Sequence, residues 1–132
     1  MFVDDAARYI SVFFLKRKEE AAQYVKNYLT NLKTHDKNPK AIRVDRGTEF
    51  INENLTSWCR EQGLDIQTTA PYSPSQNGIA ERMNRTLVEL ARAMMKGQNL
   101  PEFLWEYAIA HAAYLRNRSH TAILKRNSPY QI

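Results

Sequence analysis

Residues 41–68, AIRVDRGTEFINENLTSWCREQGLDIQT, contain the alternation that decides the fold. AIRV is a short β-rich run that ends at Asp45 beside a glycine turn, and LDIQT is a second such run. Between the two runs, EFINENLTSWCREQG has the pattern of a helix that stops at Gly63. Strands that alternate with helices predict an α/β sheet with helices on its faces.

The rest of the chain extends this alternation. MFV and ISVFFL, joined by DDAARY, predict a hairpin. KRKEEAAQYVKNYLTNLK predicts an amphipathic helix that THDKNP ends, and its apolar positions are Ala21, Val25, Tyr28, Leu29 and Leu32. A long helix is expected over about 79–96, and a last one in LPEFLWEYAIAHAAYLRNR with Pro101 in its first turn. We expect one domain, residues 1–132.

The charge of the chain is uneven. Hydrophobic residues make up 43% and charged residues 25% of the 132 residues, which is typical of a globular domain. The formal net charge is +5; residues 1–66 hold 11 Lys and Arg against 10 Asp and Glu, whereas residues 67–132 hold 8 against 4. The basic second half favours a polyanionic partner such as nucleic acid, although many domains with this charge have no such partner.

Several classes of protein are disfavoured by the residue types. Cys59 is the only cysteine and the three histidines are scattered, so neither a disulfide nor a Cys/His zinc site is expected. Within TSWCREQ, Cys59 is expected to be a small buried hydrophobic residue. The sequence shows no run of 18 apolar residues and no signal peptide, so we expect no membrane span and an intracellular protein.

Two carboxylates stand out from this basic background. Asp45 follows a strand, where function gathers in α/β sheets. Glu81 follows a proline-rich loop, APYSPSQNG, and is expected in the first turn of the long helix. The expected core stripe of that helix is Ile79, Met83, Leu87, Leu90 and Met94. At 100° per residue, Glu81 lies opposite this stripe, on the side of Arg85, Val88 and Arg92.

A simpler reading of both carboxylates stays open from the residues alone. Glu81 and Arg85 are spaced to form an i,i+4 surface ion pair worth a few tenths of a kcal/mol. Asp45 by itself equally fits a turn-capping aspartate.

The flanking motifs resemble those of a known family. VDRGTEF, then 35 residues between Asp45 and Glu81, then YSPSQNGIAERMNRTL resemble the D,D-35-E catalytic core of retroviral and retrotransposon integrases. FVDDAARYISVFFL, LPEFLWEYAIAHAAYLRNRS and NSPYQ resemble the copia-type retrotransposon branch. The resemblance covers essentially the whole chain.

This resemblance implies an RNase H-like fold and DNA integration. Integrases trim the 3′ ends of their element's DNA and join them to target DNA by in-line attack on phosphodiesters, with two Mg²⁺ or Mn²⁺ ions. By analogy, Asp45 and Glu81 are catalytic residues and metal ligands. The resemblance also implies DNA contacts from Gln76, Asn77, Arg82, Arg85 and Arg92. Turn chemistry remains an alternative for the two amides, and a solvated helix face for Arg92.

The resemblance further implies partners and a location. DNA, as both element ends and target, is the expected partner, and the chain is expected to form a homo-oligomer. The expected location is the nucleus and the cytoplasm, with no membrane contact.

The chain departs from the family pattern at its start. The family's first aspartate lies on a first, central strand that should precede FVDD, so we expect an N-terminally truncated core whose RNase H-like mixed sheet, flanked by helices, lacks that strand. Asp4 and Asp5 match the second-strand region and are expected to shape the hairpin turn. Three hypotheses follow: an active transferase or nuclease core, a catalytically inactive nucleic-acid-binding remnant of a transposon polyprotein, or a fragment without a stable fold.

Overall fold

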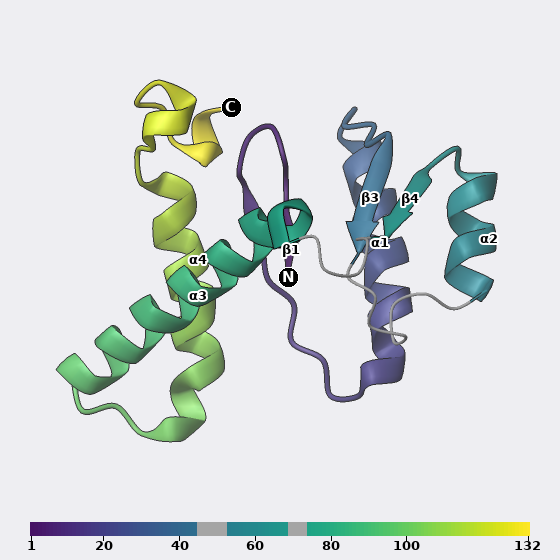
Figure 1. Cartoon of the computed structure of the whole chain (residues 1–132). Helices are drawn as coiled ribbons and strands as arrows, with labels where there is room; N and C mark the ends of the chain where they lie inside the picture. The colour runs from purple at the N-terminus through teal and green to yellow at the C-terminus, as the bar shows by residue number, and fades with distance from the viewer. Residues whose placement is uncertain (45–52, 69–73) are drawn as a thin grey trace. The chain divides into compact units, whose positions relative to one another are not determined.

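The structure is a computed structural model that describes residues 1–44, 53–68 and 74–132, and the side chains of 74–77 are not part of that description. The chain divides into two compact units, residues 15–77 and residues 1–14 with 78–132, which are described separately. The architecture is mixed α/β, with helices and small sheets (Figure 1). None of the described helices has the length and apolar character needed to cross a membrane.

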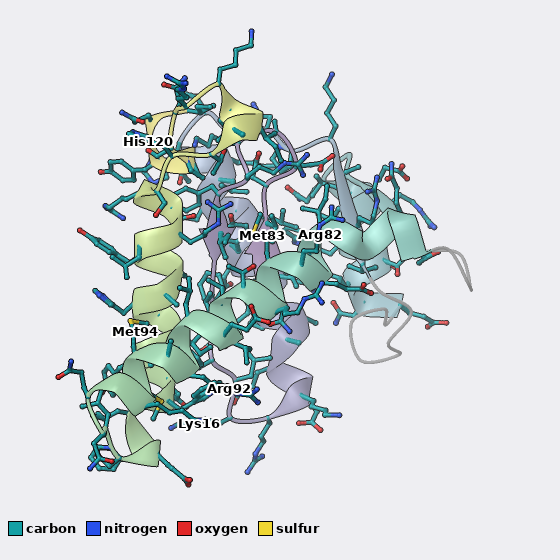
Figure 2. The ribbon with its side chains drawn as sticks, turned by 60° about the vertical axis from the view of Figure 1, so that its left-hand side comes forward. Lys16, Arg82, Met83, Arg92, Met94 and His120 are labelled. Atoms are coloured by element: carbon teal, nitrogen blue, oxygen red, sulfur yellow. The ribbon has the colours of Figure 1, made fainter. Side chains whose placement is uncertain are left out.

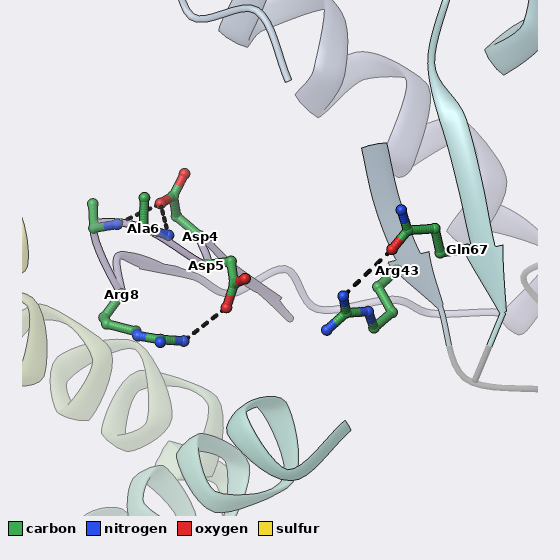
Figure 3. A network of polar contacts seen from close by, with 7 residues as sticks. Asp4, Asp5, Ala6, Arg8, Arg43 and Gln67 are labelled. Carbon is green, nitrogen blue, oxygen red and sulfur yellow. Dashed lines mark hydrogen bonds and ion pairs between the residues drawn. The ribbon is translucent and has the colours of Figure 1, made fainter. Parts of the chain in front are cut away.

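The unit of residues 15–77 is built on a parallel strand pair. Strand β3 (Ala41–Val44) pairs in parallel with β4 (Asp65–Thr68), and helix α2 (Glu53–Glu61) lies between them in sequence (Figure 1). Opposite residues Arg43 and Gln67 also bond through their side chains, where Nη2 of Arg43 donates to Oε1 of Gln67 at 3.3 Å (Figure 3). The two predicted strands are therefore confirmed, and so is the predicted helix over 53–61, whereas its expected first residues, 49–52, lie outside the described residues.

Helix α1 (Ala21–Thr34) confirms the predicted amphipathic helix of the same unit. It follows a short 3-10 turn, η1 (Lys18–Glu20). The apolar stripe of α1 is buried at Ala21, Val25 and Leu29. Cys59, on α2, is fully buried, and this burial raises the pKa of its thiol while Lys26 acts in the opposite direction. Cys59 is thus a packing residue, as predicted, with its thiol protonated at neutral pH.

Three helices end in the same way. After α2, Gly63 has φ +68°, its N–H donates to the Arg60 carbonyl, and the N–H of Leu64 donates to the Cys59 carbonyl, which is the Schellman pattern. Asp36 after α1 and Asn99 after α3 take the same left-handed conformation. The predicted stop at Gly63 is confirmed.

The other unit begins with a hairpin. Strands β1 (Phe2–Val3) and β2 (Ile10–Ser11) pair antiparallel, although each is only two residues long. Oδ1 of Asp4 accepts hydrogen bonds from the N–H groups of Ala6 (2.9 Å) and Ala7 (2.6 Å). Asp5 forms an ion pair with Arg8 at 2.8 Å (Figure 3). The prediction that Asp4 and Asp5 shape the turn is confirmed.

Two helices supply the core of this unit. Helix α3 (Pro74–Gly97) and α4 (Trp105–Arg118) meet through small residues, because Ala91 clusters with Ala108 and Ile109. A second cluster joins Ile10 of the hairpin to Leu87, Ala112 and Ala113. Met83 and Met94 of α3 pack against that second cluster (Figure 2). Alanine at these contacts lets the two helices approach closely.

Parts of the predicted core stripe of α3 are wrong. Leu90 is 37% exposed, whereas Ala91 is fully buried. Val88, expected on the side of Glu81, packs instead against the cluster around Ala91. The buried face is therefore rotated toward Ala91, since the alanines of α4 accept a small residue there better than a leucine.

The start of α3 was also predicted wrongly. The helix begins at Pro74 rather than near 79, so the segment 74–78 is helical and not part of a loop. Proline is well suited to the first helical position because its missing N–H has no partner there in any case. Glu81 consequently lies in the third turn of α3, not in the first.

The end of the chain carries short 3-10 turns. η2 (Glu102–Leu104) leads into α4, and Pro101 precedes η2 in an extended conformation instead of lying inside the helix. η3 (Ala122–Leu124) and η4 (Pro129–Gln131) follow α4, and η4 contacts α4. The described strands form two two-stranded sheets, one in each unit, whereas the sequence predicted a single mixed sheet.

Candidate functional site

The outer face of α3 carries the residues that the sequence singled out. Glu81, Arg85 and Arg92 are all exposed. At 100° per residue they fall within about 40° of one another, on the side away from buried Leu87 and Ala91. We call these three residues the α3 outer face; Figure 2 shows Arg92 directed away from the packing side, where Met94 lies.

Glu81 has no charged partner within this face. Both Glu81 and Arg85 are described residues, and among the described residues the ion pair of the structure joins Arg8 to Asp5 and not these two. The i,i+4 surface pair that was one reading of the sequence is therefore not formed. Among the described residues, the exposed carboxylate of Glu81 therefore has no ion-pair partner and is available to bind a cation.

Arg82 lies apart from the α3 outer face. It is exposed, and its guanidinium runs back along the helix, since a Cβ placed on Gly78 would lie 3.6 Å from Nη1 of Arg82 (Figure 2). The Arg82 carbonyl also accepts a hydrogen bond from Oγ1 of Thr86 at 2.9 Å. Arg82 thus extends the positive surface toward the N-terminal end of α3.

The remaining predicted site residues are only partly described. Gln76 and Asn77 lie in the first turn of α3, in contrast to the loop expected from their composition, and their side chains are not described. Asp45 lies outside the described residues. The structure therefore brings the three arginines and Glu81 together on one helix, and the pairing of Asp45 with Glu81 stays a prediction.

The donor chemistry of Glu81 suits a hard cation. Carboxylate oxygens are the ligands that Mg²⁺ prefers, and this ion is commonly held by one or two carboxylates together with phosphate oxygens and water. Within residues 1–44, 53–68 and 74–132, no three His, Cys, Asp or Glu side chains gather closely enough to form a metal site. Glu81 therefore fits as one carboxylate ligand of a Mg²⁺ site that further groups would complete.

A second cluster of charged and aromatic side chains was not predicted from the sequence. The guanidinium carbon of Arg118 lies 3.7 Å from the ring centroid of Tyr114 and 4.2 Å from that of Tyr130. His111 stacks on Tyr114 with the rings 5.9 Å apart and inclined by 8°. The i,i+4 spacing of Tyr114 and Arg118 at the basic end of a helix is the pattern that indicates such a contact. We call these four residues the Arg118 stack.

Comparison with known families defines the class of protein. The integrase core domain family matches residues 1–74, and a second integrase core domain family matches residues 62–129. The chain belongs to the integrase core domain family, with its RNase H-like core.

Particular relatives narrow this class to retrotransposons of the copia type. The chain is 36% identical over 133 residues to the Retrovirus-related Pol polyprotein from transposon TNT 1-94 of Nicotiana tabacum, a match that covers 99% of this chain and 10% of that protein. It is 32% identical over 136 residues to the Pol polyprotein from transposon RE1 of Arabidopsis thaliana, covering 99% of this chain and 9% of that protein. The chain spans about a tenth of the length of these relatives. The predicted resemblance to copia-type integrases is confirmed.

Solved structures agree on the fold. The integrase catalytic core domain of HTLV-2 in complex with magnesium, in a trimeric form, matches with a TM-score of 0.71 at 21% identity, over 98% of this chain and 80% of that one. A chain of the simian T-cell lymphotropic virus intasome in complex with a PP2A regulatory subunit, B56 gamma, matches with a TM-score of 0.74 at 23% identity, over 98% of this chain and 45% of that one. The fold of this chain is that of integrase catalytic cores.

Proposed function

We propose that this chain acts in DNA integration, as the core that carries out 3′-end processing and strand transfer of retrotransposon DNA. The observation that carries the proposal is the exposed carboxylate of Glu81, which has no ion-pair partner among the described residues and shares a helix face with Arg85 and Arg92. Membership of the integrase core domain family supports the reaction type. The trimming step breaks a P–O3′ bond with water, and the joining step forms a new P–O bond from the freed 3′-hydroxyl while a target P–O3′ bond breaks.

The chain's own residues would hold and orient the reactants. Glu81, with Asp45 as the proposed second ligand, would supply carboxylate oxygens to Mg²⁺ or Mn²⁺. When bound, two such ions activate the attacking oxygen and stabilise the leaving oxygen. Arg85 and Arg92 would donate N–H groups to phosphate oxygens, so the DNA backbone would lie along the α3 outer face. Gln76, Asn77 and Arg82 would extend these contacts toward the N-terminal end of α3.

The expected partners follow from the same proposal. Element-end DNA and target DNA would bind together, and a homo-oligomer would present two DNA ends to one target. The similar structures are a viral intasome and a trimeric form of a catalytic core domain, which supports an assembly of several chains.

The test is metal-dependent joining of a labelled duplex to a plasmid. Glu81→Gln and Asp45→Asn are expected to abolish both joining and plasmid nicking in Mg²⁺ or Mn²⁺. Glu89→Gln is the matched control, because Glu89 is an exposed glutamate on the same helix and receives the same substitution. Activity that survives Glu81→Gln, or that falls equally in Glu89→Gln, would contradict the assignment.

A second candidate function is DNA binding without catalysis. The observation that favours it is the charge of residues 67–132, with 8 Lys and Arg against 4 Asp and Glu, together with the exposed arginines of α3. DNA affinity that is unchanged by EDTA and weakens steeply with salt, with no nicking in either metal, would support this candidate.

A further inference from the structure

The Arg118 stack holds a guanidinium between two tyrosine rings on the surface of the unit that contains α4. Tyr114 is 51% and Tyr130 60% exposed, and Arg118 itself is exposed. Tyr114 comes from α4 and Tyr130 from η4, so the two rings approach Arg118 from separate elements. The guanidinium carbon lies 3.7 Å from the Tyr114 ring centroid and 4.2 Å from the Tyr130 ring centroid, so two aromatic rings restrict the position of this exposed side chain.

The hydrogen-bond donors of Arg118 are not used by its two ring contacts. A guanidinium has five N–H donors, and a cation–π contact with a ring face takes the place of no hydrogen-bond acceptor for them. Among the described residues, Arg118 has no ion pair and no side-chain hydrogen bond. Stacking also restricts the rotamers of a long side chain before any ligand arrives, which lowers the entropy lost on binding. The stack therefore presents a fixed fork of donors of the kind that matches a phosphate bidentately.

The stretch of sequence that carries the stack is basic. Residues 107–132 contain Arg116, Arg118, Lys125 and Arg126 and no Asp or Glu. Lys125 and Arg126 are exposed and occupy consecutive left-handed positions, with φ of 51° and 70°, in the tight turn after η3. A repeating anion is favoured here, because several cations with no acidic residue near them in sequence attract a polyanion more strongly than an isolated phosphate.

We propose that Arg118 is a preorganised phosphate-binding residue and that the end of α4 with η3 and η4 forms a second contact surface for the backbone of duplex DNA. This surface is distinct from the α3 outer face. The choice of DNA as the polyanion rests on the proposed function. The exposed ring of Tyr130 would lie beside the sugar-phosphate backbone, while the basic turn at Lys125 and Arg126 would contact neighbouring phosphates.

The test is fluorescence anisotropy of a short labelled DNA duplex with the full chain in EDTA, so that no metal-dependent step contributes. Arg118→Gln is expected to weaken binding about tenfold and to lower the salt slope, log K against log salt, by about 0.9, the value for one lost phosphate contact on B-DNA. Arg118→Lys should recover only part of the affinity, since an ammonium keeps the charge but not the fork. Lys37→Gln, which removes one exposed charge elsewhere, is expected to change affinity less than twofold.

Two outcomes with the Arg118 variants would each overturn this inference. One is an Arg118→Gln chain that keeps its cooperative melt and binds DNA as the Lys37→Gln chain does. The other is full recovery of affinity and slope by Arg118→Lys, which would reduce the role of Arg118 to charge alone. If Arg118→Gln does not fold, the side-chain N–H signals of Arg118 in the natural chain decide instead: they should shift on adding duplex DNA, and unchanged signals would refute the contact.

The same measurements separate this inference from the proposed function. Loss of joining in Glu81→Gln with unchanged metal-free affinity tests catalysis alone, whereas Arg118→Gln in EDTA tests binding alone. Polyglutamate serves as a competitor in the same assay. If it displaces the duplex as effectively as unlabelled DNA does, the surface binds any anionic chain, which would contradict the assignment to DNA.

Discussion

The side-chain amide of Asn117 forms two hydrogen bonds with the backbone of Ile10. Oδ1 of Asn117 accepts from the Ile10 N–H at 2.8 Å, and Nδ2 donates to the Ile10 carbonyl at 2.8 Å. Asn117 is only 4% exposed, and Ile10 belongs to β2. The amide therefore satisfies both backbone groups of one residue of a two-residue strand, as a neighbouring strand would.

Loss of this amide should destabilise the chain strongly. Asn117→Ala leaves a buried N–H and a buried carbonyl of Ile10 without partners, at about 1–3 kcal/mol each. We expect the free energy of unfolding, measured by urea denaturation, to fall by about 2–4 kcal/mol. Asn84→Ala, at an exposed asparagine of α3, is the control and should stay within about 0.5 kcal/mol of the natural chain. A loss below about 1 kcal/mol for Asn117→Ala would show that water replaces the amide.

Gly63 and Gly97 offer a test of backbone conformation without steric interference. An added Cβ would meet nothing within 4 Å at either glycine, but only Gly63 has a positive φ, +68°. Gly63→Ala should therefore cost about 1–2 kcal/mol through the left-handed conformation alone. Gly97→Ala should be neutral or stabilising by up to about 1 kcal/mol, because alanine restricts the unfolded chain. Thermal melts of the two variants should move in opposite directions, and a parallel shift would contradict the account.

Cys59 should make the stability of the chain depend on alkaline pH. Burial raises the pKa of its thiol, so the folded state binds the proton more tightly than the unfolded state. A raised pKa gives a contribution that is complete below the unfolded value, about 8.5, and that is lost as pH rises toward the folded value. Urea midpoints should fall above this pH more steeply in the natural chain than in Cys59→Ala. Parallel pH profiles would exclude this contribution.

The α3 outer face should contribute phosphate contacts even without metal. Arg85→Gln and Arg92→Gln together are expected to lower the salt slope of duplex binding by about 1.8, if each arginine neutralises one phosphate. Arg60→Gln, at an exposed position of α2, is the control for loss of one charge elsewhere and should leave the slope unchanged. An unchanged slope in the double variant would place the arginines in solvent, away from the DNA backbone.

Much of the secondary structure could be predicted because periodicity and stop residues agree along most of the chain. The stripe of Ala21, Val25 and Leu29 and the stop at Gly63 both follow from local rules. The start of α3 could not be predicted, because Pro, Ser, Gln, Asn and Gly favour turns and the helix-starting role of Pro74 depends on its context. The exposure of Leu90 and the burial of Ala91 depend on α4, whose facing alanines no local pattern of α3 reveals.

The candidate site could likewise be predicted only in part from the sequence. The position of Glu81 away from the core could be predicted, because helical periodicity alone places it there. The absence of an ion pair between Glu81 and Arg85 could not be predicted, because the i,i+4 spacing permits the pair and the side-chain rotamers decide whether it forms. Asn117 was overlooked because a polar residue near the end of a basic helix is usually exposed, and its partner lies 107 residues away in sequence.

Ala91, Ala112 and Ala113 lie in the clusters that join α3 to α4, beside longer side chains such as Met83 and Leu87. The orientation of α3, and with it the direction in which Glu81 points, therefore depends on how these side chains pack. One methyl group added at Ala91 or Ala112, where α3 packs on α4, would change the orientation of the α3 outer face without contacting any residue of that face. If such substitutions changed the integration activity proposed above, the change would reflect the orientation of Glu81 and not its chemical reactivity.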